Sequence, residues 1–267
     1  QVFAAGGLSL EDAATVTDVL IHADLRGHAS HGLTRIPIYL ERIRRGAVKA
    51  RPSIAISRPA PGLLAVDGDN GPGPVVSLRA VDAAIETARE VGLERVFLAA
   101  PRGEDRTGRL AFWTGFAAEL CDRAERFAEA GLRLGYHNHH WECLVCEDGR
   151  TGLEVLLENS AGAPLDWQGD LAWVYRARQD PVPLIDAHAG RLTAVHVKDI
   201  AHKGTFVAED GWLPPGQGEL DWAGLAARIH AGGTRLFVAE HDNPADPVGF
   251  ARAAKAWMDR EIGGLGA

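Results

Sequence analysis

Four short apolar runs in the second half of the chain each end in a cluster of histidine and carboxylate residues. They lie at residues 132–142 (LRLGYHNHHWE), 165–173 (LDWQGDLAW), 192–199 (LTAVHVKD) and 236–242 (LFVAEHD). Short apolar runs of this kind are typical of buried parallel strands. The carboxyl ends of such strands meet at one rim of a (β/α) barrel, where that fold carries its catalytic residues. The four clusters therefore predict four strands that share one polar site.

From about residue 93 onward, predicted strands and helices alternate. The strands are expected at residues 95–99, 132–136, 165–169, 193–197 and 236–240, and the helices at 110–130, 152–159, 183–188, 222–231 and 247–261. Such alternation indicates a parallel sheet. A closed barrel of this type needs eight strands, and the pattern supplies five. We therefore predict an α/β fold with an incomplete (β/α) TIM-type barrel of about five parallel strands.

The first 91 residues follow a different, mainly helical pattern. Helices are expected at residues 9–24, 33–45 and 75–91, and the proline- and glycine-rich stretch before the last of them holds one strand candidate, residues 63–66. This segment does not supply the missing strands in the required pattern. We therefore divide the chain into a helical N-terminal segment, residues 1–91, and a barrel segment, residues 92–267.

Composition limits the partners that we expect. The net charge of −8 argues against nucleic acid or an anionic membrane as the main partner. No apolar run reaches membrane-spanning length, and the first residues lack the charged start of a signal peptide. The three cysteines do not make a disulfide framework, and the single pair Cys143 and Cys146 is a weak signal for zinc or redox chemistry. A reducing cytoplasm and a small-molecule substrate are the resulting expectations.

Residues 88–267 resemble the sugar phosphate isomerase/epimerase family, the xylose-isomerase-like TIM barrels. The motifs that carry the resemblance follow the order of that family and cover about its last five strands, at residues 92–101, 135–142, 170–173, 180–181, 190–191, 195–199, 209–211, 216–222 and 239–242. In that family, one side chain from each of four strands holds a divalent cation. The resemblance carries this role over to His137, Asp170, His196 and Glu240. His137 stands where many members have a glutamate.

This set of residues also implies a chemistry. Two imidazoles favour Mn²⁺, Co²⁺, Zn²⁺ or Fe²⁺ over Mg²⁺. The cation would bind adjacent oxygens of a polyol or ketose and stabilise an enediolate, while a carboxylate removes the proton next to the carbonyl. Glu240 is the expected base, and His139, Glu142 and Lys198 are the candidates for the partner acid. Isomerase, epimerase and dehydratase activities all stay open.

Residues 6–91 resemble a second family, the non-Rossmann malate/L-lactate dehydrogenases, which include ureidoglycolate and sulfolactate dehydrogenases. The matching residues are 23–35 (ADLRGHASHGLTR), Tyr39, Gly46, 66–71 (VDGDNG) and 83–89. The resemblance implies that Ser30, His31 and Arg35 contact substrate and cofactor, since arginine pairs a carboxylate and histidine passes a proton to a carbonyl. The match lacks the later segments that bind the nicotinamide, and no GxGxxG string offers another nucleotide site. We therefore do not expect this segment to bind NAD(P).

The chain thus resembles two fragments joined near residues 89–95, and three hypotheses follow. The first is a cation-dependent isomerase, epimerase or dehydratase that acts on a sugar, sugar phosphate or cyclitol. The second is a fragment of an NAD(P)-dependent malate/lactate-type 2-hydroxy-acid dehydrogenase, and the third is an inactive fusion remnant. A five-strand sheet has two bare edges, so either the N-terminal segment covers one edge, or a partner chain does, or the molecule is poorly folded. A homo-oligomer is one expectation from this argument.

Several of these residues also have purely structural interpretations. Asp166 is a rival of Asp170 in the second cluster. Lys198 and Asp199 are candidates for an ion pair that only orders the rim. Residues 216–218 (GQG) are either a turn or a cradle for an anion, and the turn is the better interpretation because the P-loop lysine is missing.

Overall fold

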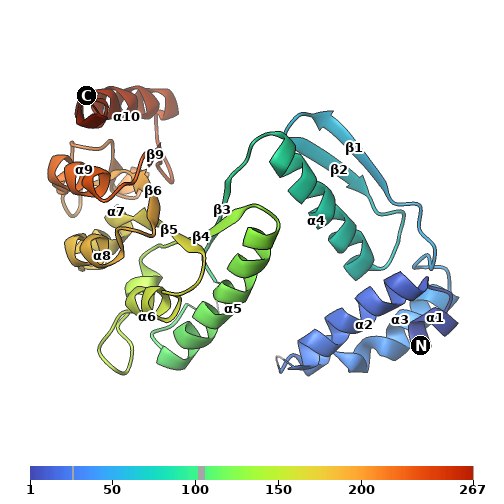
Figure 1. Ribbon diagram of the computed structural model, residues 1–267. Helices are drawn as coiled ribbons and strands as arrows, with labels where there is room; N and C mark the ends of the chain where they lie inside the picture. Colours follow the sequence, from blue (N-terminus) through green and yellow to red (C-terminus); the bar gives the residue numbers. More distant parts are fainter. Residues whose placement is uncertain (26, 102–105, 267) are drawn as a thin grey trace. The chain divides into compact units, whose positions relative to one another are not determined.

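The computed structural model describes residues 1–25, 27–101 and 106–266 (Figure 1). Arg26, which belongs to the string at residues 23–35, lies outside them. Packing divides the chain into two compact units, Gln1–Glu94 and Arg95–Ala267. Among the described residues, no helix combines the length and the apolar character that crossing a membrane requires.

The first unit is mainly helical, as predicted. It contains α1 (Val2–Ala5), α2 (Leu10–Leu25), α3 (Ile36–Arg44), α4 (Gly73–Glu90) and a hairpin of β1 (Ala55–Ala60) and β2 (Leu63–Asp67). Its core is a small apolar cluster of Phe3, Leu8, Ala13, Val16, Leu20 and Val75. The sequence predicted β2 but not β1. All six residues of β1 are exposed and include a proline, so the strand has no apolar alternation to reveal it.

The second unit is built on a five-stranded parallel sheet in the order β3-β4-β5-β6-β9. The strands are β3 (Arg95–Ala99), β4 (Arg133–His137), β5 (Leu165–Asp170), β6 (Leu192–Val197) and β9 (Leu236–Ala239). The helices between and after them are α5 (Leu110–Glu129), α6 (Gly152–Asn159), α7 (Leu171–Arg176), α8 (Pro181–His188), α9 (Trp222–Ala231) and α10 (Pro247–Glu261). In Figure 1 the strands follow one another as a curved sheet with α5 beside β4. The predicted five-strand, incomplete barrel is confirmed.

The central strands of this sheet are buried on both faces. All six positions of β5 are buried, and β4 is buried from Leu134 to His137. Trp113 of α5 and Trp167 of β5 are completely inaccessible within the large core of this unit. Each large apolar side chain buried in this way stabilises the unit by about 1.5–3 kcal/mol.

Two features between β6 and α9 were not predicted. The expected loop at residues 201–218 contains a 3₁₀ turn (Val207–Glu209) and the second strand of a short antiparallel pair, β7 (Asp199–Ile200) and β8 (Trp212–Leu213). The short helix α7, which directly follows β5, was also missed. These elements are too short to show a period in the sequence.

Candidate metal centre

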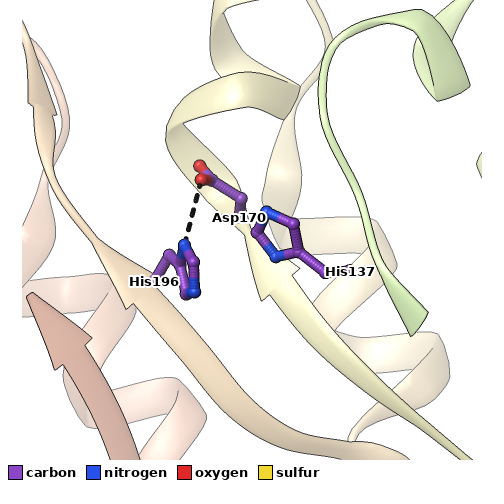
Figure 2. A group of neighbouring side chains, drawn as sticks. All are labelled: His137, Asp170 and His196. Carbon is purple, nitrogen blue, oxygen red and sulfur yellow. Dashed lines mark ion pairs between the residues drawn. The ribbon is translucent and has the colours of Figure 1, made fainter. Parts of the chain in front are cut away.

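Three side chains converge at the carboxyl end of the parallel sheet. His137 ends β4, Asp170 ends β5, and His196 lies one residue before the end of β6. The register pairs His137 with Gln168 and Asp170 with His196, so all three residues lie on one face of the sheet. One ligand atom from each lies within 4.8 Å of those of the other two. Figure 2 shows the two imidazoles and the carboxylate turned toward one another.

Three buried polar atoms of this group make no hydrogen bond within the described part of the chain, and one of them, Asp170 Oδ2, has an ion-pair contact 3.1 Å from Lys198 Nζ. His137 Nδ1, Asp170 Oδ2 and His196 Nδ1 are buried and make no hydrogen bond. A buried polar atom without a partner destabilises the folded state, and native proteins leave few of them. A divalent cation would supply a partner to all three atoms at once. The residues present therefore fit such an ion.

The turn from β5 into α7 directs one oxygen of Asp170 toward the group. Asp170 is the N-cap of α7, and its Oδ1 accepts a hydrogen bond from Trp173 N at 3.0 Å. Its Oδ2 is left facing the histidines, 3.7 Å from His196 Nδ1. The helix cap thus fixes the rotamer of the carboxylate.

Glu240, the fourth predicted ligand, lies at the edge of this group. Its Oε2 is 3.8 Å from His196 Nδ1, and the same oxygen forms an ion pair with Lys198 Nζ. The Lys198 ammonium is almost completely buried and also lies 3.1 Å from Asp170 Oδ2 and 3.0 Å from Asp242 Oδ2. Lys198 therefore forms ion-pair contacts with three carboxylates, two of which belong to the predicted ligand set.

The two imidazoles of the group differ in the direction of their pKa shifts. Burial, together with the nearby His196, lowers the pKa of His137 to about 3, so this ring is neutral at pH 7. Burial alone would lower the pKa of His196, but the carboxylates of Asp170 and Glu240 outweigh it and raise that pKa. Burial alone would raise the pKa of Glu240, but His196 and Lys198 lower it to about 2. The site thus contains a neutral imidazole and an ionised carboxylate before any cation binds.

The other two catalytic candidates, His139 and Glu142, lie beside the group and differ in whether their side-chain polar atoms make hydrogen bonds. His139 stacks on Trp141 with ring centroids 4.4 Å apart, and burial lowers its pKa to about 4. Its Nδ1 is buried without a partner among the described residues. Both oxygens of Glu142 are occupied, since Oε1 accepts from Tyr136 Oη at 2.5 Å and Oε2 accepts from His139 N at 2.9 Å. Glu142 therefore links β4 to the segment that follows it through these two hydrogen bonds.

The structural alternatives are also resolved by the contacts. Asp166 lies at the start of β5, where it forms an ion pair with Arg133 and lies 3.3 Å from Arg95 Nε. It is remote from the group formed at the strand ends. Asp199 makes its hydrogen bonds with the backbone of its own loop, while Lys198 pairs with other carboxylates. Residues 216–218 do hold an anion, the carboxylate of Asp199, and they do so as a turn.

A cleft of about 1160 Å³ lies next to the group. Trp173, Arg176, Trp212 and Asp242 line it, and Lys198 Nζ lies 5.0 and 4.4 Å from the ring centroids of the two tryptophans. The sequence placed Asp242 in the same polar cluster as Glu240 but did not assign it a role. Arg176 and Trp212 gave no signal because they lie in α7 and β8, which were not predicted.

The N-terminal candidates lie together on the surface of the first unit. Ser30 Oγ is 3.0 Å from His31 Nδ1, and Arg35 Nε donates to Ser30 O at 2.6 Å. All three side chains are exposed within that unit. The predicted contact string is therefore assembled, but as an open surface.

Comparison with known proteins separates the two parts of the chain. Residues 1–119 match the malate/L-lactate dehydrogenase family. A malate dehydrogenase from Pyrococcus abyssi is 41% identical over 42% of this chain and 30% of its own length. The chain thus spans about a third of this relative. The family match continues past Glu94 into the second unit, where it covers β3 and the first half of α5.

Solved structures match the remainder. A sugar phosphate isomerase/epimerase from Parabacteroides distasonis superposes with a TM-score of 0.55 at 18% identity, covering 68% of this chain and 62% of its own. An IolI protein with a bound zinc atom gives a TM-score of 0.56 at 12% identity, covering 72% and 71%. The chain combines parts similar to two families. The resemblance to dehydrogenases at the front and the xylose-isomerase-like fold behind it are both confirmed.

Proposed function

We propose that the second unit is a divalent-cation-dependent enzyme that moves a proton next to the carbonyl group of a sugar, sugar phosphate or cyclitol. The observation that carries the proposal is the convergence of buried ligand atoms from His137, Asp170 and His196 that make no hydrogen bond among the described residues. The fold supports it, because such barrels place their chemistry at the strand carboxyl ends. The similar structures are described as a sugar phosphate isomerase/epimerase and a protein with bound zinc.

The ligand set favours some ions over others. Two imidazoles and one carboxylate suit Zn²⁺, Fe²⁺, Co²⁺ or Mn²⁺ better than Mg²⁺, which prefers oxygen ligands. His137, Asp170 and His196 would hold the ion, and Glu240 is close enough to His196 to join them. When bound, the ion would act as a Lewis acid on adjacent oxygens of the substrate.

Proton transfer is assigned to residues beside the ion site. A carboxylate with a pKa of about 2 is a weak base, so the ion pair of Glu240 with Lys198 reduces its ability to take a proton. His139 has a neutral ring and an unpartnered Nδ1, which makes it the better proton acceptor. Glu240 and Asp242 hold the Lys198 ammonium in place. Burial alone would lower the pKa of Lys198, but these carboxylates, together with Asp170, raise it, so Lys198 is assigned to stabilise negative charge as an ammonium and not to give up its proton.

The adjacent cleft offers room for the rest of the substrate. Charged and polar side chains make up about half of its lining, and three aromatic residues, Trp173, Tyr175 and Trp212, contribute to the rest. Trp173 provides flat apolar surface, backed by the buried ring of Trp212, and Arg176 and Asp242 provide polar contacts. This arrangement favours an isomerase, epimerase or dehydratase substrate of at least monosaccharide size.

Solvent exchange tests the proposal directly. The full chain, loaded with Co²⁺, Mn²⁺ or Zn²⁺, is incubated in D₂O with a panel of ketoses, ketose phosphates and keto-cyclitols, and deuterium uptake is followed by mass spectrometry. We expect uptake at the carbon next to the carbonyl, loss of uptake with a chelator, and a reduction of at least about 100-fold in His139→Gln, the size expected for general base loss. His188→Gln, at the end of α8, is the matched control. Absence of exchange on every substrate by metal-loaded protein would contradict the proposal.

A 2-hydroxy-acid dehydrogenase is the second candidate, because the family match covers residues 1–119. Ser30, His31 and Arg35 are exposed, and the chain spans about a third of the similar malate dehydrogenase. Titration of NADH and NADPH fluorescence tests this candidate, and unchanged emission removes it.

A further inference from the structure

Asn138 lies between His137, the last residue of β4, and His139, and its side chain is completely buried. Its Oδ1 accepts hydrogen bonds from Trp167 Nε1 at 2.9 Å and from Asp170 N at 3.0 Å. Its Nδ2 donates to Asp170 O at 3.1 Å and to His139 O at 3.4 Å. We propose that Asn138 is a positioning residue that sets the distance between His137 and Asp170, and this inference rests on the proposed cation site.

The sheet shows why this position needs such a residue. The pairing of β4 with β5 ends at His137 and Gln168, so the main chain of β4 no longer holds β5 where Asp170 lies. The side-chain amide of Asn138 holds β5 there instead. Its Oδ1 accepts a hydrogen bond from Asp170 N, and its Nδ2 donates one to Asp170 O. It thereby imitates the main-chain pairing of one further strand residue. Asp170 is paired on its other side with His196, so the amide connects all three ligand-bearing strands.

The hydrogen-bond chemistry permits only an amide here. Two N–H donors face Oδ1 and two carbonyl oxygens face Nδ2, so a reversed amide would meet like groups on both sides. Aspartate would place a second oxygen against the carbonyls of Asp170 and His139. Alanine would leave the backbone N–H and C=O of Asp170 buried without these partners. The side chain does not reach the cation itself, and its effect passes through the backbone of Asp170.

Residues that orient metal ligands change metal affinity about 10–100-fold when they are replaced. We therefore expect Asn138→Ala to weaken Co²⁺ binding by about that factor. The variant Asn138→Asp distinguishes an effect on the position of Asp170 from an effect of charge on cation binding. The added negative charge by itself would tighten binding of a cation, whereas loss of placement weakens it, so weaker binding in this variant identifies a positioning effect.

The experiment uses the full chain and Co²⁺ as the probe, with titration calorimetry for affinity and the visible absorption of bound Co²⁺ for coordination geometry. Asn159→Ala is the matched control, because Asn159 also uses its amide to bond a backbone carbonyl, Val155 O at 2.8 Å, but at the end of α6. We expect unchanged affinity and spectrum in Asn159→Ala, and weaker binding with an altered spectrum in both Asn138 variants. Thermal unfolding without metal shows that each variant is folded.

The outcomes separate this inference from the proposed function. If the unaltered chain binds no Co²⁺, the proposed site is wrong and the inference is wrong with it. If the unaltered chain binds Co²⁺ and the Asn138 variants bind it equally well, only the inference is overturned. If both Asn138 variants fail to fold while Asn159→Ala folds, Asn138 serves the fold and not the ligands, which also overturns it.

Discussion

Glu142 is a carboxylate that no solvent reaches, held by one hydroxyl and one backbone N–H. Its oxygens accept from Tyr136 Oη and His139 N. Burial raises the pKa of Glu142 to about 7, although both donors favour the ionised form. A group whose folded pKa is raised stabilises the fold fully below its unfolded pKa of 4.5 and loses this contribution as the pH rises through 7.

This shift predicts a pH-dependent difference between the unaltered chain and Glu142→Gln, which cannot ionise. Between pH 5.5 and 8.5, the free energy of unfolding of the unaltered chain should fall relative to the variant by about 2 kcal/mol. Urea unfolding at a series of pH values measures the difference. Glu158→Gln, an exposed carboxylate on α6, is the control and should change the unfolding free energy by less than about 0.5 kcal/mol. A difference that stays constant over this range would contradict the account of Glu142.

The sequence predicted where the site residues lie better than what they touch. His137, Asp170 and His196 could be placed because parallel strands bring their carboxyl ends together. Asp166 and Asp170 lie on the same face of β5 but toward opposite ends of that strand. Asp166 therefore pairs with Arg133, whereas Asp170 joins the candidate metal group. The three partners of Lys198 depend on rotamers and on contacts between distant elements, which no local pattern encodes.

At the scale of the element, the loop that borders the cleft depends on one buried carboxylate. Asp199 Oδ1 accepts from Ile200 N at 2.8 Å and from Leu220 N at 3.0 Å. Its Oδ2 accepts from Gly216 N and Gly218 N, both at 3.0 Å. Gly216 has φ +77°, and an added Cβ on Gly218 would clash with Asp199, so both positions require glycine.

Asn in place of Asp199 should therefore loosen this loop. The amide NH₂ would face N–H donors, and the loss of two hydrogen bonds to a buried charged group should reduce the free energy of unfolding by about 3 kcal/mol. Hydrogen–deuterium exchange should increase in residues 201–218 and not in α5. Asp221→Asn is the matched control, because Asp221 caps α9 at an exposed position and Asn caps a helix equally well. Equal exchange in the two variants would contradict this role of Asp199.

Element prediction succeeded where the chain has a period and failed where it does not. The strands and long helices of the second unit lie within a few residues of their expected positions because their apolar residues recur with the period of the element. The missed helices and strands are α1, β1, β7, β8 and α7. Each is either exposed or too short for its pattern to differ from that of a loop.

At the scale of the whole molecule, the chain contains two separate apolar cores. The candidate ligands all belong to the second unit. A ligand that binds only the folded state of one unit stabilises that unit alone, by about 2.7 kcal/mol at a concentration 100 times its Kd.

Calorimetry of the full chain should accordingly show two unfolding transitions, of which Co²⁺ raises only one. His196→Ala should abolish the rise and leave the other transition in place. Arg228→Ala, which removes an exposed ion pair with Asp186 in the same unit, serves as the control and should retain the rise. One single transition that moves as a whole on addition of Co²⁺ would contradict the division.

The sequence predicted two unlike parts and an incomplete barrel because each part carries its own motifs. The exact boundary stays a prediction. Packing divides the chain after Glu94, whereas the family match continues to residue 119. Among the described strands, β3 and β9 pair on one side only, so a homo-oligomer that covers an edge also stays a prediction.

Anomalous X-ray diffraction from crystals grown with Co²⁺ tests the central claim most directly. The account predicts one strong anomalous peak between β4, β5 and β6, about 2.0–2.2 Å from a nitrogen of His137, a nitrogen of His196 and an oxygen of Asp170. Crystals of His196→Ala grown in the same way should lack that peak. Fully ordered side chains with no anomalous density between them, or a cobalt ion bound only elsewhere, would contradict it.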